Sequence, residues 1–182
     1  MKRVLLLSLG IFLVAGMAFG QAGYIGLFSD IGYTSCAMYD TPGLQTIYAV
    51  HKASTGSTAS QFRIAVDPGM TCAAVGVING FPTTIGNPAT GISVAYGACY
   101  PSDILLLTWN FFCSGTSAPC SRLQVVPDPS ALSGTIEIVD CDQFKLVGGG
   151  SVMFINPDGN CDCGEVVPVR ESSWGAIKSL YH

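Results

Sequence analysis

Cysteine offers the widest choice of chemistry in this chain of 182 residues, which contains eight of them. Thiols can bind metals, exchange electrons or pair as disulfides. An even number of cysteines in an exported chain is typical of disulfides, so we expect up to four such bonds. Cys161 and Cys163 could instead form a redox pair or hold a metal, but the other cysteines are available to them as disulfide partners. The eight residues are Cys36, Cys72, Cys99, Cys113, Cys120, Cys141, Cys161 and Cys163.

One disulfide follows from a predicted strand register. If Arg122–Val126 and Thr135–Cys141 form an antiparallel hairpin with apolar residues facing one another, Cys120 lies opposite Cys141. Side chains directly opposite in such a pair have Cβ atoms about 4.5–5.5 Å apart, near enough for a disulfide after a small adjustment. We therefore predict a Cys120–Cys141 bond. A Cys113–Cys120 loop closure competes with it, and a Cys72–Cys113 bond between two core strands would be compatible with it.

Side chains for nucleophilic or acid–base catalysis are sparse. Of the two histidines, His182 is the last residue, and His51 lies beside Lys52 in a predicted strand, where we expect a surface or half-buried side chain. The chain has no Gly-x-Ser-x-Gly elbow. Glu137 and Asp140 share a predicted strand, but residues three apart in a strand point to opposite faces, whereas glycosidase carboxylates converge on one bond. The sequence therefore predicts a protein that is not an enzyme, with a hydrolase using these two carboxylates as the weakest alternative.

A short acidic segment near the C-terminus resembles the beginning of a calcium loop. Asp158, Asn160 and Asp162 place oxygen side chains at alternate positions. The match ends there, because Cys163 stands where glycine is expected and Val169 where the bidentate glutamate should be. An Asn-Pro-Asp-Gly turn explains the same residues without a metal. Calcium is therefore a secondary hypothesis, and we expect no other cofactor.

Exposed aromatic side chains are candidates for carbohydrate binding. Tyr33, Tyr39 and Tyr100 lie in predicted loops, where tyrosine can stack on a sugar ring. Trp109 lies in the most apolar run of the chain, so we expect it in the core. The three tyrosines are therefore the candidate ligand-binding residues.

The first twenty residues read as a secretory signal peptide. Lys2 and Arg3 precede an apolar run, Val4–Met17, and small residues follow it. We expect cleavage after Gly20, with Ala22 as the alternative. Removal of the two basic residues changes the formal net charge from −4 to −6. No second apolar run is long enough to span a bilayer, so we expect a secreted protein located in the periplasm, at the cell surface or in the medium.

The composition excludes several classes of protein. Only 11% of the residues are charged and 49% are hydrophobic, whereas average domains carry about 25% charged residues. A disordered chain has low hydrophobicity and high net charge. Nucleic-acid binders carry a basic surface, but this chain has a pI near 4.8. Coiled coils contain many more charged residues.

Short runs separated by turn residues predict an all-β fold. Gln61–Val66 and Gly91–Tyr96 alternate between apolar and smaller or polar residues, as half-buried strands do, and Ile104–Phe112 is apolar on both faces, as a fully buried central strand would be. We predict a disulfide-stabilised antiparallel β-sandwich, Ig-like or jelly-roll-like, over residues 21–168. The other predicted strands are Tyr24–Phe28, Thr46–Lys52, Thr71–Val77, Arg122–Val126, Thr135–Ile138, Phe144–Val147 and Val152–Ile155.

The last residues, 169–182, follow a different pattern. Trp174, Ile177 and Tyr181 recur at helical spacing, which predicts a short amphipathic helix. A helix of this length is not stable alone, so we expect the tail either to dock on the domain or to act as a sorting signal.

Five segments together resemble a group of uncharacterised secreted bacterial proteins that end in a Trp-Gly-x-Ile/Val-Lys-x-Leu-Tyr tail. The resemblance implies a secreted, disulfide-rich β domain and brings no activity or catalytic residues. The segments are Ala59–Phe62, Thr84–Asn87 with Gly91–Cys99, Val126–Pro129 with Val139–Cys141, Asn156–Gly159 with Cys161–Cys163, and the tail Ser173–Tyr181.

The low charge, the leader and the missing catalytic set together predict a secreted, non-enzymatic structural, surface or assembly protein. Few charges leave strand edges and apolar patches free to associate. We therefore expect self-association or attachment to an extracellular or cell-surface partner, with no binding of nucleic acid. A carbohydrate- or ligand-binding module is the alternative.

Overall fold

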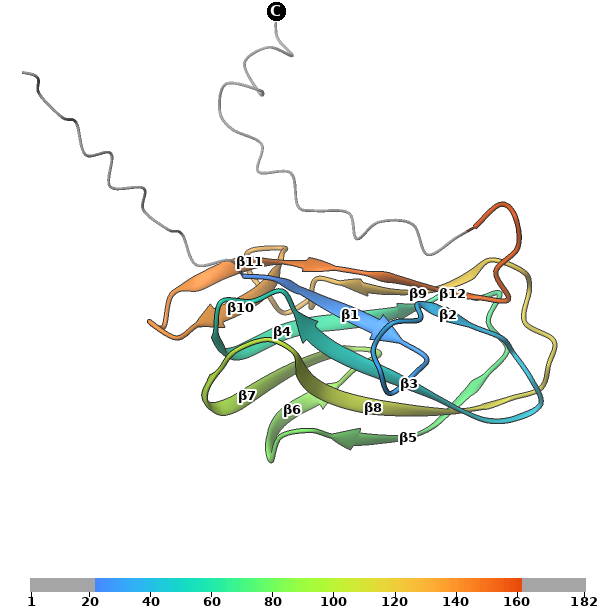
Figure 1. The fold of residues 1–182 in the computed structure, drawn as a ribbon, viewed down its shortest axis with the longest axis horizontal. Helices are drawn as coiled ribbons and strands as arrows, with labels where there is room; N and C mark the ends of the chain where they lie inside the picture. The colour runs from blue at the N-terminus through green and yellow to red at the C-terminus, as the bar shows by residue number, and fades with distance from the viewer. Residues whose placement is uncertain (1–21, 162–182) are drawn as a thin grey trace, which may run out of the picture.

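β-strands dominate the computed structural model, which describes residues 22–161 (Figure 1). No helix occurs in this range, so none crosses a membrane there. The predicted leader and the tail with Trp174, Ile177 and Tyr181 lie outside the described residues. The strands are β1 (Tyr24–Phe28), β2 (Ala37–Met38), β3 (Gly43–Lys52), β4 (Ser57–Val66), β5 (Ala73–Asn79), β6 (Thr83–Asn87), β7 (Gly91–Tyr100), β8 (Ile104–Cys113), β9 (Ser121–Val126), β10 (Ile136–Asp140), β11 (Lys145–Gly150) and β12 (Val152–Ile155).

The strands form one hydrogen-bonded path that folds over a shared core. β1, β3, β8 and β5 lie next to one another in that order, and β10, β4, β7 and β6 form a second run. β11 connects the two runs, because it pairs with both β1 and β10. β4 pairs with β10 through its first half and with β9 through its second half, and β9 leads on to β12 and β2. The all-β prediction is confirmed.

Two pairings depart from the predicted antiparallel arrangement. β1 pairs with β11, and β2 with β12, in parallel. A tight hairpin enforces antiparallel pairing only between strands that follow one another in the chain. β1 and β2 come from the beginning of the domain and β11 and β12 from its end, so no hairpin fixes their direction.

The core is built by the predicted alternation. Phe62 and Ile64 of β4 point inward, as do Ile92 and Val94 of β7. Burying large apolar side chains such as these is the main source of stability in a domain of this size. The largest fully buried side chains are Ile25, Leu27, Ile47, Phe62, Ile64, Ile92, Leu106, Leu107, Phe111, Leu123, Ile138 and Met153.

β8 is a central strand, but the prediction that both of its faces are buried is wrong. It lies between β3 and β5, and Trp109 and Phe111 point into the core. Asn110 is half-buried on the other face, and Phe112 is 58% exposed there. An irregularity opposite Ala49 and Val50 brings Leu106 and Leu107 inward in succession. The outer face of this layer is therefore open to solvent.

The short strands β2 and β6 are absent from the sequence prediction. β6 reads Thr-Thr-Ile-Gly-Asn and ends in Gly86 and Asn87, residue types that are typical of turns. It is strand because it pairs with β7 along its whole length. Tertiary pairing thus overrides a weak local preference.

Candidate interaction surface

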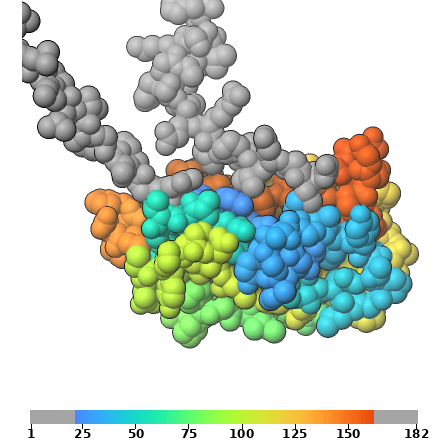
Figure 2. All heavy atoms as spheres, in the orientation of Figure 1, coloured from blue at the N-terminus to red at the C-terminus, as the bar shows by residue number. Residues whose placement is uncertain are grey.

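One side of the molecule carries almost no charge. β5, β6, β7 and β8 contain no aspartate, glutamate, lysine or arginine, and Asp103 is the only such residue between Asp67 and Arg122. β5 and β6 run along the lower margin of the view in Figure 1, and the green residues of the space-filling view cover the same margin (Figure 2). We call β5 and β6, together with the exposed side chains of Leu44 and Phe112, the uncharged side.

Large apolar side chains are exposed on the uncharged side. The strand register places Leu44, Phe112 and Ala73 in one row across β3, β8 and β5. Water solvates such a row poorly, and exposed apolar patches mark sites of association. The exposed fractions are 63% for Leu44, 57% for Val75, 63% for Ile78, 73% for Ile85 and 58% for Phe112.

β5 is an edge strand. Among the described residues it pairs only with β8, and six of its seven residues are exposed. The N–H of Gly80 donates to the carbonyl of Leu106 on β8. Because backbone groups alternate in direction along a strand, the N–H and C=O groups of Val77 and Asn79 point away from β8, to the free edge. This edge offers hydrogen-bonding groups to another strand.

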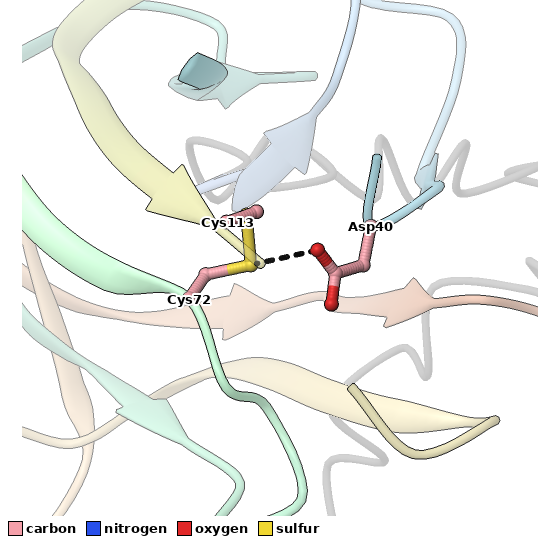
Figure 3. Close-up of side chains that lie close together, drawn as sticks. All are labelled: Asp40, Cys72 and Cys113. Atoms are coloured by element: carbon pink, nitrogen blue, oxygen red, sulfur yellow. Dashed lines mark hydrogen bonds between the residues drawn. A yellow bond between two sulfur atoms is a disulfide. The ribbon is translucent and has the colours of Figure 1, made fainter. Parts of the chain in front are cut away.

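A disulfide fixes the beginning of this edge. Cys72, which directly precedes β5, is bonded to Cys113 at the end of β8, with 4.1 Å between the Cα atoms. Asp40 lies against the bond in Figure 3, with Oδ1 3.6 Å from Sγ of Cys72. The sulfur has no proton to donate, so this is a packing contact. The Cys72–Cys113 pairing that the sequence suggested is confirmed.

Asp40 also holds the loop that follows β8. Its carboxylate is buried and accepts N–H bonds from Gly115 at 2.9 Å and from Ser117 at 2.7 Å. Burial raises the pKa of Asp40, but the hydrogen bonds from Ser117 and Gly115 outweigh it, so the pKa lies below its usual value. The ionised carboxylate is therefore part of the folded structure.

A hollow of about 190 Å³ lies on the outer face of the second run of strands. Ala59 of β4 and Ala95 of β7 pair at its centre, where small side chains leave the backbone open. Ile85 of β6 lines one flank, and Lys145 lines the other with Glu137. The hollow therefore has one apolar flank, which adjoins the uncharged side, and one charged flank.

His51 is fully buried, so the expectation of a surface or half-buried histidine is wrong. Its Nε2 lies 2.7 Å from the carbonyl of Ala22, and its Nδ1 lies 3.1 Å from the hydroxyl of Tyr96. Burial lowers the pKa of His51 and raises that of Tyr96, so both are neutral at pH 7. The alternation of β3 places His51 inward, but its hydrogen-bond partners come from segments that the sequence does not show to be close.

The predicted Cys120–Cys141 disulfide is wrong. Cys120 is bonded to Cys161, with a Cα–Cα distance of 5.8 Å, and Cys141 is bonded to Cys99, with a distance of 5.3 Å. The predicted hairpin does not form, because β9 and β10 pair with different halves of β4 and not with each other. The competing Cys113–Cys120 bond is also excluded. Cys36 is disulfide-bonded as well, and Cys163 lies outside the described residues.

Two groups of side chains have the composition of metal sites. Asp40 lies with Cys72 and Cys113, and Asp158 lies with Cys120 and Cys161, each group within 4.8 Å. Metal-binding cysteine is a thiolate, whereas these four sulfurs are paired in disulfides. The groups are therefore parts of the disulfide framework.

The candidate catalytic carboxylates have separate structural partners. Glu137 accepts bonds from Lys145 and from the Ser133 hydroxyl, both at 2.8 Å, and these two bonds lower its pKa. Asp140 accepts N–H bonds from Asp142 and Phe144 in the turn after β10. Each carboxylate thus stabilises its own local structure.

The candidate tyrosines do not form one aromatic platform, since no ring contact joins any two of them within residues 22–161. Tyr33 packs against Phe28 and Tyr48, with ring centroids 6.1 and 6.0 Å away. Tyr39 is 64% exposed, and Tyr100 contacts Phe81 edge-on.

In the calcium candidate, Asp158 accepts the N–H of Asn160 at 2.7 Å and lies beside Sγ of Cys120. This bond closes the predicted turn. Asp162 lies outside the described residues, so calcium binding stays a prediction.

Solved structures with a similar arrangement of strands are cohesin modules. The cohesin module of a family 33 glycoside hydrolase from Clostridium perfringens is 8% identical, with a TM-score of 0.49 over 75% of this chain and 99% of that one. The sixth cohesin of Acetivibrio cellulolyticus scaffoldin B, in complex with a dockerin, is 12% identical, with a TM-score of 0.46 over 74% and 98%. A non-cellulosomal cohesin from the archaeon Archaeoglobus fulgidus is 13% identical, with a TM-score of 0.44 over 72% and 89%. No family model matches the sequence, and neither does any curated protein sequence.

Proposed function

We propose that this chain is an exported, non-catalytic domain that assembles with other protein through the uncharged side. The observation that carries the proposal is the edge of β5, where free backbone groups and exposed apolar side chains occur together without a charge. A strand added to such an edge gains backbone hydrogen bonds and buries apolar surface in one step.

β5 lacks most of the features that usually protect an edge strand from pairing with another chain, and this supports the proposed role. Proteins usually guard an edge strand with lysine, proline, a bulge or a covering element. β5 contains neither lysine nor proline, and its single irregularity lies between Ala74 and Gly76. The remaining part, Gly76–Asn79, pairs regularly with β8, and no other strand in residues 22–161 pairs with its outer edge.

The rest of the described surface carries the charges that keep a protein in solution. Arg122, Glu137, Asp142 and Lys145 lie on or beside strands β9 to β11, away from the edge of β5. This division gives the domain one side for solvation and one for docking.

The size of the native complex tests the proposal. Wild-type protein in the extracellular fraction of its source cells should elute above the mass of one chain. Val75→Lys should shift it towards the mass of one chain, because burying an unpaired ammonium in an interface is costly. Leu132→Lys is the matched control, since Leu132 is fully exposed in the loop between β9 and β10, and it should leave the complex unchanged. A wild-type protein with the mass of one chain, or two variants that behave alike, would contradict the proposal.

A further inference from the structure

The free edge of β5 can pair with the same edge of a second copy of the chain. We propose that the occupant of this edge is a second copy of the chain, paired antiparallel with β5 about a two-fold axis at Ile78. The inference rests on the proposed function and adds the identity and orientation of the partner.

The direction of the backbone groups restricts the axis to a residue of β5, and the exposed side chains favour Ile78. Val77 and Asn79 present their N–H and C=O groups to the free edge, whereas Gly80 bonds to β8. In an antiparallel pair centred on Ile78, Val77 lies opposite Asn79 of the second copy, and each pair exchanges both backbone bonds. A centre between two residues would place a group at the free edge opposite one that points towards β8. Centres at Val77 and Asn79 also meet this backbone condition, but only a centre at Ile78 places the exposed Ile78 side chains of the two copies opposite each other.

The side chains on the outer face allow this approach. Ile78 is 63% exposed, and it would meet Ile78 of the second copy at the axis, where paired side chains are closest. The outer positions on either side of it are Gly76 and Gly80, and Gly76 of each copy would lie opposite Gly80 of the other. A Cβ added to Gly76 would have no neighbouring atom within 4 Å, whereas a Cβ added to Gly80 would collide with the carbonyl of Leu105. Neither glycine places a side chain between the copies.

Charge also favours a copy as the partner. A two-fold axis places the residues beside it near their own equivalents, so a charge there would repel its copy. β5 contains no charged residue and therefore carries no such penalty. A partner recognised by salt bridges would find no group to pair with on this strand.

The edge is also held in place before it binds. The Cys72–Cys113 bond anchors the beginning of β5, and the side chain of Val77 packs against the core. Association then orders few additional groups, which lowers the entropic cost of pairing.

The test uses two oppositely charged variants of the oxidised full-length mature protein. Wild type should reach twice the mass of one chain in sedimentation equilibrium as its concentration rises. Ile78→Lys and Ile78→Glu alone should each remain at the mass of one chain up to a concentration at least about tenfold higher, because like charges meet at the axis. An equimolar mixture should recover the doubled mass, since lysine then faces glutamate.

Ile85→Lys and Ile85→Glu are the matched controls, since Ile85 is exposed on the neighbouring edge strand β6. They should keep the wild-type mass. The inference is overturned by a wild type that stays at the mass of one chain, by Ile78 variants that still dimerise, or by a mixture that stays monomeric. In each case the proposed function stands if the extracellular complex remains sensitive to Val75→Lys, because another partner then occupies the edge.

Discussion

The Nε2 atom of His51 lies 2.7 Å from the carbonyl oxygen of Ala22, which ties the start of the described chain to β3. His51 is neutral and buried, so it donates this proton to Ala22 while Nδ1 accepts from the hydroxyl of Tyr96. Gly23 follows with a carbonyl that accepts the N–H of Gly149. Ala22 is thus the first residue with a structural partner in the described range.

This bond predicts where the leader is removed. Cleavage after Ala22 would leave His51 buried with an unpaired donor, whereas cleavage after Gly20 preserves the bond. The intact mass of the secreted protein should therefore correspond to a chain that begins at Gln21. A chain that begins at Gly23 would contradict the prediction.

His51 also predicts a pH dependence of stability. Burial lowers its pKa below the usual 6.5, so the unfolded chain binds the proton at higher pH than the folded chain does. The free energy of unfolding should therefore fall as the pH drops from about 6.5 towards the lower folded pKa. Melting temperatures should decrease in this window for the wild type and for the control His182→Asn. His51→Phe should melt lower overall but lose this dependence, and a dependence that persists would contradict the assignment.

Asp40 predicts a separate acid transition. Its lowered pKa means that its contribution to stability is complete above about pH 3.8 and is lost as the pH falls through the folded value. Asp40→Asn should lower the free energy of unfolding by about 1–3 kcal/mol, because the amide NH₂ faces backbone donors. Urea titration of the oxidised protein measures this. The exposed Asp142→Asn is the control, and equal losses in both variants would contradict the role of Asp40.

The disulfide framework predicts a specific peptide map. Digestion without reduction should link Cys72 to Cys113, Cys99 to Cys141 and Cys120 to Cys161. Because eight cysteines are present and Cys36 is also bonded, we predict that its partner is Cys163. A peptide that joins Cys120 to Cys141 would contradict the pairing of β9 and β10 with β4.

Local pattern was enough to locate strands but not their neighbours. β1 and β12 coincide with their predicted ranges, because turn residues delimit each of them. The alternation of Phe62 and Ile64 also indicated the inward face of β4. The register of β9 and β10 could not be derived, because both hairpin pairing and separate pairing with β4 bury the same apolar side chains. The wrong disulfide follows from this single ambiguity.

The uncharged side was only partly visible in the sequence. The low overall charge predicted association, and the charge-poor stretch from Asp67 to Arg122 is readable in the chain. The sequence does not show which strands of this stretch are exposed. β7 is enclosed between β4 and β6, whereas β5 lies at an edge. Long-range pairing sets the position of each strand in the sheet, and this position decides whether an uncharged strand is enclosed or exposed.

Hydrogen exchange of the β5 amides shows whether the edge of β5 is the docking site. In dilute protein, the amides of Val77 and Asn79 should exchange quickly, because they point to the free edge. In the associated state, whatever the partner, both should become protected, while amides in the turn 128–134 should exchange as before. Protection that appears elsewhere and leaves Val77 and Asn79 fast would contradict docking at this edge.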